Sequence, residues 1–565
     1  MRTLVTALLL SGLVMALASA ATADSNLPSP ANIRITTIPQ LNNEEQVFIC
    51  PTDSNIIIAN WRDFRYGFRQ IGIGRSADGG LTWTDSLIHW TSQYFKEQSW
   101  QSDPTLTVDR NGRFFMSVLD YIPTGAPNTS TIAFYRSDDK GASWLGPFAH
   151  APLGDFFEDK QFITVDRTGG PHDGNVYCAW ARFNNPNRIM FVRSTDGAVT
   201  FDDTLTVGPR QTSTGCGGIV IDAGQFANPV VSSGGRVHVF WQGYALDSGA
   251  ACTGVTSLKQ RYSDDGGQTF ISERTVTPVS GWTQADGGIA TYSQPAADAD
   301  ITGGPFHGNV YIAFTNIGPE DPSANSDIDF VRSTDNGLTW SDRLQINDDA
   351  GSDLTDNFHP WLIVNQDGIV IVVFYDQRKD PGHYLFDLFA AYSFDGGESF
   401  TANHRISSVS SSPGQLKVSQ TLLPWTLDEN GFQRPLSSPH AGLIGEYIGV
   451  TAFRDKINAV WTDSRDGNSE VYTANWYMPM LEPRLLTPAG GTIAQDAAFS
   501  WATSWKHDQD RYRLEISPSA DFSAAVITQI SDTPSISAPG SLADCVWYLR
   551  VEALTVSGNA HSAYS

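Results

Sequence analysis

The chain has little cysteine and few positive charges. Its 565 residues include only 5 Cys, and 61 acidic side chains outnumber 36 basic ones, for a formal net charge of -25. So few cysteines in so long a chain exclude a small disulfide-stapled protein. The acidic balance, with no local basic patch, argues against binding to phosphate backbones or anionic membranes, so we expect no nucleic acid partner.

Long apolar runs are missing after the first residues. No later stretch approaches about 18 uninterrupted apolar residues, so we expect no membrane insertion. The start, MRTLVTALLLSGLVMALASAATA, has one Arg, an apolar run and small residues suited to cleavage. This pattern is typical of a signal peptide over residues 1–23 and predicts a secreted protein, periplasmic or extracellular. The 16 Trp, 18 Tyr and 30 Phe exclude a disordered chain.

The cysteines give no metal-ligand spacing, and we expect neither a metal nor a cofactor. Cys216 and Cys252 lie in loop-like sequence around one strand pair and are the best disulfide candidates. Cys50 and Cys178 fall inside apolar strand patterns, which predicts buried small hydrophobes. The acidic stretch 298–300 offers oxygen ligands to calcium but lacks EF-hand spacing, so a solvated loop is the simpler interpretation.

One eight-residue pattern recurs six times, every 57 to 70 residues. The copies are SADGGLTW (76–83), SDDKGASW (137–144), STDGAVTF (194–201), SDDGGQTF (263–270), STDNGLTW (333–340) and SFDGGESF (393–400). Gly supplies the positive φ of a tight turn, and the Asp and Ser or Thr side chains bond to turn backbone groups. The closing Trp or Phe is expected to be buried. Each copy therefore predicts a hairpin tip.

Two further elements precede each of the six copies, and a seventh set of these elements has no copy after it. Both are short apolar strands, such as NEEQVFIC (43–50) followed by NIIIANWRDFR (55–65). Four strands per unit, repeated radially, predict an all-β fold, a β-propeller over residues 24–480. The seventh unit lacks an outer strand, and NIRITTI (32–38) is available to supply it. We therefore favour seven blades, with six as the alternative.

The eight-residue pattern resembles the Asp-box, or BNR, repeat of sialidases and related secreted β-propellers. After residue 480 the pattern changes to alternating strands, and YRLEI (512–516) and WYLRV (547–551) are a predicted pair. Residues 481–565 resemble a fibronectin type III-like β-sandwich.

The second strand of three units ends in an aromatic-x-Asp-x-Arg pattern. The trios are Trp61, Asp63 and Arg65; Phe374, Asp376 and Arg378; and Trp461, Asp463 and Arg465. In a closed ring of seven these units are neighbours, so the arginines are expected to gather on one face, where they suit an acidic sugar. The alternative is that each Asp and Arg form an ion pair within their own blade.

The starts of the first strands are expected on the same face. They contribute Glu45, Asp103, Lys160, Gln161, Gln294, His359, Trp361, Glu446 and Tyr447. Glu446 next to Tyr447 is the pair most suited to catalysis, and His359 is a possible proton carrier near neutral pH.

The resemblance to sialidases implies roles for some of these residues. It implies Arg65, Arg378 and Arg465 as a clamp for a substrate carboxylate, and Tyr447 with Glu446 as the nucleophile pair. It implies Asp103 or Asp63 as the acid/base, while the Phe-Arg-Ile-Pro segment of sialidases is absent. The expected substrate groove is completed by His359, Trp361, Trp61, Asp376 and Asp463.

The sequence thus predicts a secreted carbohydrate-active protein whose partner is a glycan or glycoconjugate. The resemblance favours a sialidase-like glycoside hydrolase acting on acidic glycans. The alternatives are a non-catalytic propeller that binds glycans or proteins outside the cell and a polysaccharide lyase with a Tyr or His base. The oligomeric state is left open.

Overall fold

The structure is a computed structural model. It describes residues 28–65, 69–88, 99–122, 130–150, 156–183, 187–208, 212–215, 218–246, 256–317, 325–349, 355–415, 444–478, 484–487, 498–502, 511–518, 523, 527–531, 535–537 and 548–554. The expected signal peptide and the disulfide candidates Cys216 and Cys252 lie outside these residues. Cys50 and Cys178 are free and buried, as predicted.

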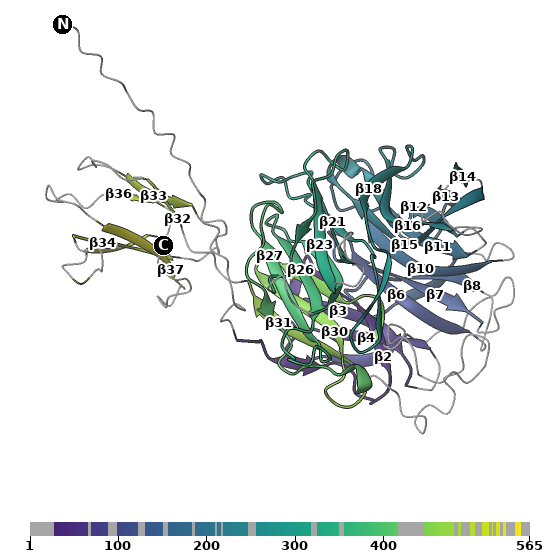
Figure 1. Cartoon of the computed structure of the whole chain (residues 1–565), viewed down its shortest axis with the longest axis horizontal. Helices are drawn as coiled ribbons and strands as arrows, with labels where there is room; N and C mark the ends of the chain where they lie inside the picture. Colours follow the sequence, from purple (N-terminus) through teal and green to yellow (C-terminus); the bar gives the residue numbers. More distant parts are fainter. Residues whose placement is uncertain are drawn as a thin grey trace, which may run out of the picture.

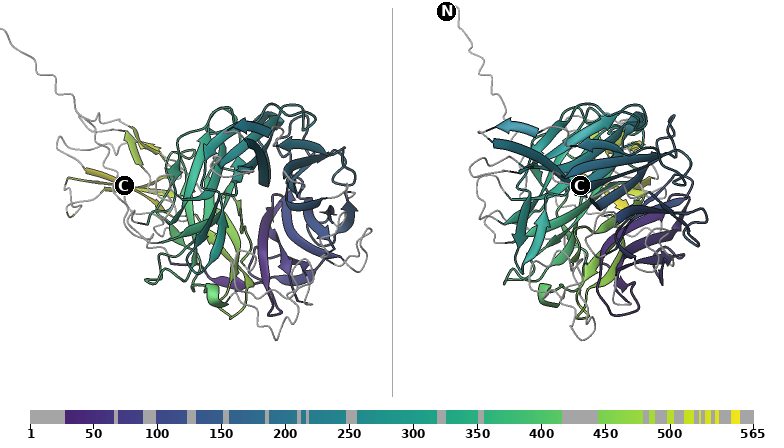
Figure 2. Two further views of the ribbon diagram at one scale, coloured as in Figure 1. Left: turned by 45° about the vertical axis from the view of Figure 1, so that its right-hand side comes forward. Right: turned by 90° about the vertical axis from the view of Figure 1, so that its right-hand side faces the viewer.

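Seven antiparallel sheets form a seven-bladed β-propeller, as expected from the repeat (Figure 1; Figure 2). In blades 1 to 6 the main strands run outwards from the axis in the order in which they follow each other in sequence, so each of these blades is a local meander. Blades 1 to 3 are β2(Asn42–Cys50), β3(Asp53–Asp63), β4(Gln70–Ser76) and β5(Thr84–Leu87); β6(Trp100–Val108), β7(Phe114–Tyr121), β8(Ser130–Ser137) and β9(Leu145–Ala149); and β10(Phe157–Val165), β11(Val176–Phe183), β12(Arg188–Ser194) and β13(Leu205–Gly208).

Blade 4 and blade 5 carry additional strands near the starts of their sheets. Blade 4 is β14(Thr212–Gly215), β15(Gly218–Val231), β16(Val237–Leu246), β17(Ser257–Ser263) and β18(Arg274–Pro278). Blade 5 is β21(Ala296–Ala299), β22(Val310–Ile317), β23(Ser326–Ser333) and β24(Leu344–Gln345), and it is preceded by the separate hairpin of β19(Trp282–Ala285) and β20(Ile289–Tyr292). Blade 6 is β25(Asn357–Val364), β26(Val370–Asp376), β27(Asp387–Ser393) and β28(His404–Arg405). Short 3-10 turns occur at η1(Ser233–Gly235) and η2(Pro413–Gln415).

Blade 7 is completed by the beginning of the chain, as the sequence predicts. Its strands β29(Gly449–Phe453), β30(Lys456–Asp463) and β31(Glu470–Tyr477) are followed by β1(Asn32–Arg34), which pairs with β31 from Asn32↔Ala474 to Arg34↔Tyr472. Blades 1 and 7, purple and light green in Figure 1, therefore lie side by side. The pairing of β1 with β31 gives blade 7 its fourth, outer strand.

The six repeated turns join the third and fourth strands, and they share one set of hydrogen bonds. In the fifth copy, Ser333 Oγ donates to Asp335 Oδ1 (2.7 Å), which also accepts the backbone N–H groups of Leu338 and Thr339 (3.0 and 2.8 Å). The Thr339 hydroxyl donates to Asp335 Oδ2 (2.6 Å). These bonds satisfy the turn backbone locally, which explains why the pattern recurs.

The C-terminal residues that the structure describes form two small sheets. One is β32(Arg484–Thr487), β33(Ala498–Ala502) and β36(Ser535–Ser537), and the other is β34(Arg511–Ser517), β35(Ile527–Ser531) and β37(Tyr548–Leu554). The predicted pairing is confirmed, with Leu514 opposite Val551. The assignment of this region as a fibronectin type III-like domain stays a prediction. Within the described residues, no helix is long and apolar enough to cross a membrane.

Candidate functional site

Each inner strand begins on one face of the propeller, which we call the upper face, and five of them carry a β-bulge there. The bulges lie between Asn43 and Gln46, Ser102 and Thr105, Asp159 and Phe162, Gln225 and Asn228, and Phe358 and Trp361. One residue of each has a positive φ: Glu44 (62°), Asp103 (51°), Lys160 (51°), Phe226 (58°) and His359 (49°). Such a backbone is uncommon outside glycine, and a bulge re-aims its side chain.

The strand register shows that these bulged residues occupy one level of the central channel. In every bulged blade, the residue two positions after the positive-φ residue pairs with the equivalent residue of the second strand, as in Gln46↔Asn60 and Phe162↔Ala179. By the same count, Gln294 and Tyr447 take this level in blades 5 and 7. One side chain per blade therefore surrounds the upper mouth of the channel.

Lys160 lies at the centre of this mouth and binds three carboxyl groups. Its Nζ is 3.1 Å from Glu44 Oε1, 2.5 Å from Asp103 Oδ1 and 2.8 Å from Glu446 Oε2. Arg62 Nη1 also reaches Glu44 Oε1 (3.0 Å). We call these five residues the Lys160 cluster. The Glu446 side chain, 15% exposed, is more accessible than those of Lys160 (8%), Arg62 (6%), Asp103 (4%) and Glu44 (0%).

Burial and charge set different protonation states within the Lys160 cluster. Burial raises the pKa of Glu446 to about 7, with the charge of Glu44 adding to the effect. Burial also opposes ionisation of Glu44, but the charges of Arg62 and Lys160 outweigh it and hold the pKa of Glu44 well below its usual range. Burial favours neutral Lys160 as well, yet the nearby carboxylates raise the pKa of Lys160 well above normal. Below about pH 7, a protonated Glu446 therefore lies beside an ionised Glu44, to which it hydrogen-bonds.

Burial also raises the pKa of Asp103 within the cluster and of two carboxyl groups beside it, those of Asp159 and Glu45. Burial and the charge of Glu44 raise the pKa of Asp103, and burial with the charge of Asp103 raises the pKa of Asp159 well above normal. Glu45, the residue predicted from the strand start, points elsewhere: it accepts a hydrogen bond from the Thr462 hydroxyl (2.7 Å), and burial raises its pKa to about 8.

The structure brings Tyr447 to the cluster, but its hydroxyl is occupied. It donates to the Pro104 carbonyl (3.2 Å), and the Tyr447 ring centroid is 5.7 Å from Lys160 Nζ. Burial raises the pKa of Tyr447 well above its usual value. A protonated, hydrogen-bonded phenol does not have the properties of an activated nucleophile.

His359 is at the expected level of the channel, but it is only 3% exposed. Burial lowers its pKa to about 3, so the ring is neutral at physiological pH. This differs from the predicted proton carrier near neutrality, because the bulge turns the side chain into a packed environment beside Phe358 and Tyr375. Trp361 is two residues further on, and its ring stacks on Phe162 (centroids 5.4 Å apart) below the mouth.

Each aromatic-x-Asp-x-Arg trio is bonded within its own part of the ring. Trp61 Nε1 donates to Asp63 Oδ2 (2.9 Å), and Arg65 binds the same Asp63 (2.7 Å) and Asp85 of the outermost strand β5. The third trio repeats both bonds: Trp461 and Arg465 bind Asp463 (2.9 and 2.7 Å), and Arg465 also reaches Asn32 of β1. In the second trio, whose aromatic residue has no donor, Arg378 binds Asp376 (2.7 Å), Asp348 and Asn403.

The three arginines therefore reach towards the outer strands and share no partner. Trp61 shows why, because its ring covers β4: a Cβ added to Gly72 would lie 2.1 Å from it. The trio thus follows the surface of its own sheet outwards from the axis. As the strand period predicts, the three residues of a trio lie on one side of their strand. Their side chains extend outwards along the sheet, however, and not towards the channel axis. The arrangement corresponds to the predicted alternative, in which each Asp and Arg form an ion pair within their own blade. The Asp63 carboxylate is therefore occupied by Trp61 and Arg65.

The structure thus unites Asp103, Glu446 and Tyr447 but leaves the predicted arginine groups elsewhere. The sequence reasoning missed Glu44, Asp159 and Arg62. Glu44 was one residue from the predicted Glu45, and the only available signal was its place at the start of an inner strand.

No protein-family model matches this chain, and no curated protein matches it. Among solved structures, it is similar to an alpha-L-arabinanase of Penicillium chrysogenum (14% identity, 62% of this chain and 94% of that chain covered, TM-score 0.42). It is also similar to the Hadza microbial sialidase Hz136 (17% identity, 59% and 63% covered, TM-score 0.37) and to an ulvan lyase (11% identity, 79% and 96% covered, TM-score 0.44). Likeness at this level says nothing about what this chain binds.

Proposed function

We propose that the protein is a glycoside hydrolase whose reaction takes place at the upper mouth of the channel. The supporting observation is the Lys160 cluster, where a carboxyl with a pKa of about 7 adjoins a carboxyl that stays ionised. Hydrolysis of a glycosidic bond requires an acid for the leaving oxygen and a negative charge near the developing oxocarbenium ion. Glu446 is the proposed acid, because it keeps its proton up to about pH 7 and is the most accessible member of the cluster.

Glu44 and Asp103 are the proposed source of negative charge. Asp103 Oδ1 and Glu446 Oε2 bind the same Lys160 nitrogen at 2.5 and 2.8 Å, so these two oxygens are at most about 5.3 Å apart, a distance a single sugar linkage can bridge. Lys160 holds the carboxyl groups in place, and its charge keeps Glu44 ionised. The cluster needs no added group to carry out this acid and electrostatic work.

A neutral glycoside fits this mouth better than an acidic one. The acidic-glycan and exo-sialidase specificity depended on three free guanidinium groups, and Arg65, Arg378 and Arg465 are each bound by aspartates. A substrate carboxylate would instead approach Glu44, Asp103 and Glu446. We therefore propose a neutral sugar, handled outside the cytoplasm if residues 1–23 direct export.

A non-catalytic glycan-binding propeller is the second candidate. It is favoured by the position of the Lys160 ammonium group, which occupies the space between the carboxyl groups and would have to share it with a substrate. The lyase alternative gains no support, because the Tyr447 hydroxyl is bonded to Pro104 and His359 is buried.

Turnover of fluorogenic glycosides distinguishes these functions. The panel contains neutral pentosides and hexosides together with sialosides and uronides. We expect the wild-type protein to cleave at least one neutral glycoside, and Glu446→Gln to lower kcat/KM by about 100-fold or more because the proton donor is lost. The matched control is Glu398→Gln, at a carboxyl whose side chain is 66% exposed, which should keep full activity.

Two results would reject the hydrolase. One is absence of turnover on every glycoside while glycan-array binding is retained, which would establish the second candidate. The other is full activity of a folded Glu446→Gln protein.

A further inference from the structure

The central channel contains a second chamber below the Lys160 cluster. Phe162, Trp361 and Tyr447 separate the two, with ring centroids 5.2 to 6.2 Å apart. Beyond these rings the channel widens into a cavity of about 400 Å³ near the ends of the inner strands. We call it the lower chamber. The repeated turns of the blades lie on this same, lower face, so the lower chamber is not part of the proposed catalytic mouth.

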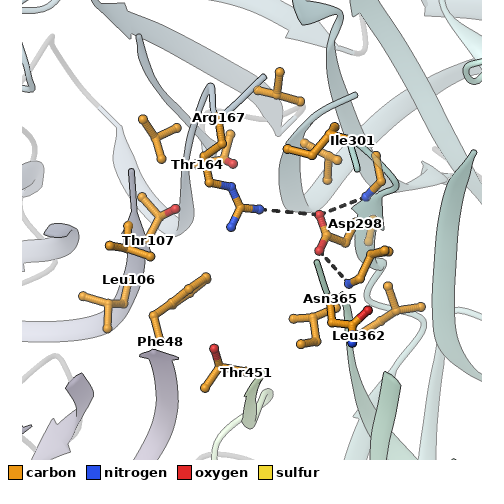
Figure 3. A pocket seen from close by; sticks show the side chains of 18 of the residues that line it. Phe48, Leu106, Thr107, Thr164, Arg167, Asp298, Ile301, Leu362, Asn365 and Thr451 are labelled. Carbon is orange, nitrogen blue, oxygen red and sulfur yellow. Dashed lines mark hydrogen bonds and ion pairs between the residues drawn. The ribbon is translucent and has the colours of Figure 1, made fainter. Parts of the chain in front are cut away.

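The walls of the lower chamber combine hydroxyl, charged and apolar groups. Each inner strand contributes one side chain at the same register level: Phe48, Thr107, Thr164, Val230, Asp298, Ile363 and Thr451. Arg167 follows β10 and extends over the chamber towards Asp298, while Phe48 and Leu106 lie on the other side (Figure 3). Polar and apolar groups are therefore interspersed around the chamber, so a bound ligand would meet both kinds.

Arg167 and Asp298 face each other without a direct hydrogen bond. Their closest atoms are 3.9 Å apart, beyond hydrogen-bond distance, and their side chains are 33% and 17% exposed. Asp298 is a strand residue of β21 rather than part of a solvated loop: its oxygens accept the backbone N–H groups of Ala299 (2.9 Å) and Val364 (2.8 Å). Within the described part of the chain, Arg167 has no closer polar partner.

The threonine hydroxyls add further bonding capacity. Thr451 Oγ1 accepts the Ile49 N–H (3.1 Å), which leaves its hydrogen available. Among the contacts of the described residues, the hydroxyls of Thr107 and Thr164 have no partner, and both side chains line the chamber. Donors and acceptors are therefore present around the cavity, while the charges of Arg167 and Asp298 cancel.

We propose that the lower chamber binds a neutral monosaccharide. The cavity volume is within the range of small-ligand sites, and its wall is about as polar as it is apolar, which suits a sugar better than an apolar ligand. A sugar hydroxyl both donates and accepts, so one inserted between Arg167 and Asp298 would satisfy both side chains. The C–H surface of the sugar would pack on Phe48 and Leu106. An ion lacks this match, because the charges of Arg167 and Asp298 oppose each other and Arg110, which also lines the chamber, is paired with Asp173 (2.9 Å). This inference does not depend on the proposed hydrolase.

Calorimetric titration of the full chain tests the proposal with glucose, galactose, arabinose, rhamnose and glucuronate as probes. We expect millimolar or tighter binding of at least one neutral sugar. Thr107→Val removes a hydroxyl at constant shape and Arg167→Met removes the guanidinium group, and each should weaken binding by about tenfold. Arg113→Met changes an arginine outside the chamber that pairs with Asp138 (2.7 Å), and should bind the sugar normally.

The outcome also separates the two sites. Glu446→Gln should leave this binding unchanged, because Glu446 lies above the aromatic rings. The proposal is overturned if no neutral sugar binds, if glucuronate binds more tightly than every neutral sugar, or if both folded chamber variants bind like the wild-type protein.

Discussion

Asp63 organises the side chains around it. Its carboxylate accepts from Trp61 (2.9 Å) and from Arg65, whose side chain is only 8% exposed. Asp63→Asn would leave the Arg65 charge dependent on Asp85 alone, so we expect a loss of about 2–4 kcal/mol in unfolding free energy. Urea denaturation measures this loss. The control is Asp264→Asn, which breaks an ion pair with Arg236 at a carboxylate that is 59% exposed and should cost less than about 1 kcal/mol.

The same variant tests the carboxylate-clamp hypothesis. If Asp63 only stabilises the blade, the folded Asp63→Asn protein should retain its activity well below its unfolding midpoint. Lost activity with unchanged stability would contradict the structural role and return Arg65 and Asp63 to the substrate site.

Glu446 makes stability depend on pH in a definite direction. Its pKa is about 7 in the folded chain against 4.5 for an ordinary Glu. Between these values the unfolded chain releases the proton while the folded chain keeps it, so rising pH favours unfolding. Below about pH 4.5 this contribution is constant. Compared with Glu446→Gln, the wild-type protein should lose up to about 3 kcal/mol between pH 4.5 and 7. Parallel stability curves for the two proteins would contradict this assignment.

Among the elements, the strands and turns were accessible to sequence reasoning because their signals are local. Period-two apolar patterns mark the four strands of a blade, and residues such as Asp335 complete a turn by bonding to backbone within four residues. The spare segment with Asn32 was assigned by counting strands, and the structure confirms its pairing with β31.

The inner-strand bulges were not accessible in this way. A bulge adds one residue, and a pleat count that ignores it selects Glu45, whereas Glu44 has the positive φ and faces Lys160. Nothing in the composition of NEEQ distinguishes the two positions. The orientation of Arg65 was hidden for a related reason: alternation tells which residues share a side of a strand, but not whether that side leads to the axis or outwards.

At the scale of the whole molecule, ring closure assembles the Lys160 cluster. Glu44, Asp103, Lys160 and Glu446 come from blades 1, 2, 3 and 7, and Lys160 is 286 residues from Glu446 in the chain. Direct contacts across the closure include Gln46 Nε2 donating to the Ile448 carbonyl (3.1 Å). The proposed active site therefore exists only while the first and last blades remain together.

Ile35 provides a test of this dependence. Its backbone N–H donates to the Val471 carbonyl (2.9 Å), and its side chain is 2% exposed beside blade 1. Ile35→Ala removes packing alone, at a cost of about 2–4 kcal/mol, whereas Ile35→Pro also removes the backbone hydrogen bond and should cost at least about 1 kcal/mol more. Thermal unfolding should follow the order wild type, Ile35→Ala, Ile35→Pro, and hydrogen exchange of β31 should accelerate most in the proline variant. Since blade 7 carries Glu446, the proposed glycosidase activity should disappear at the same temperature as this protection. Equal unfolding temperatures for Ile35→Pro and wild type would show that β1 does not hold the ring closed.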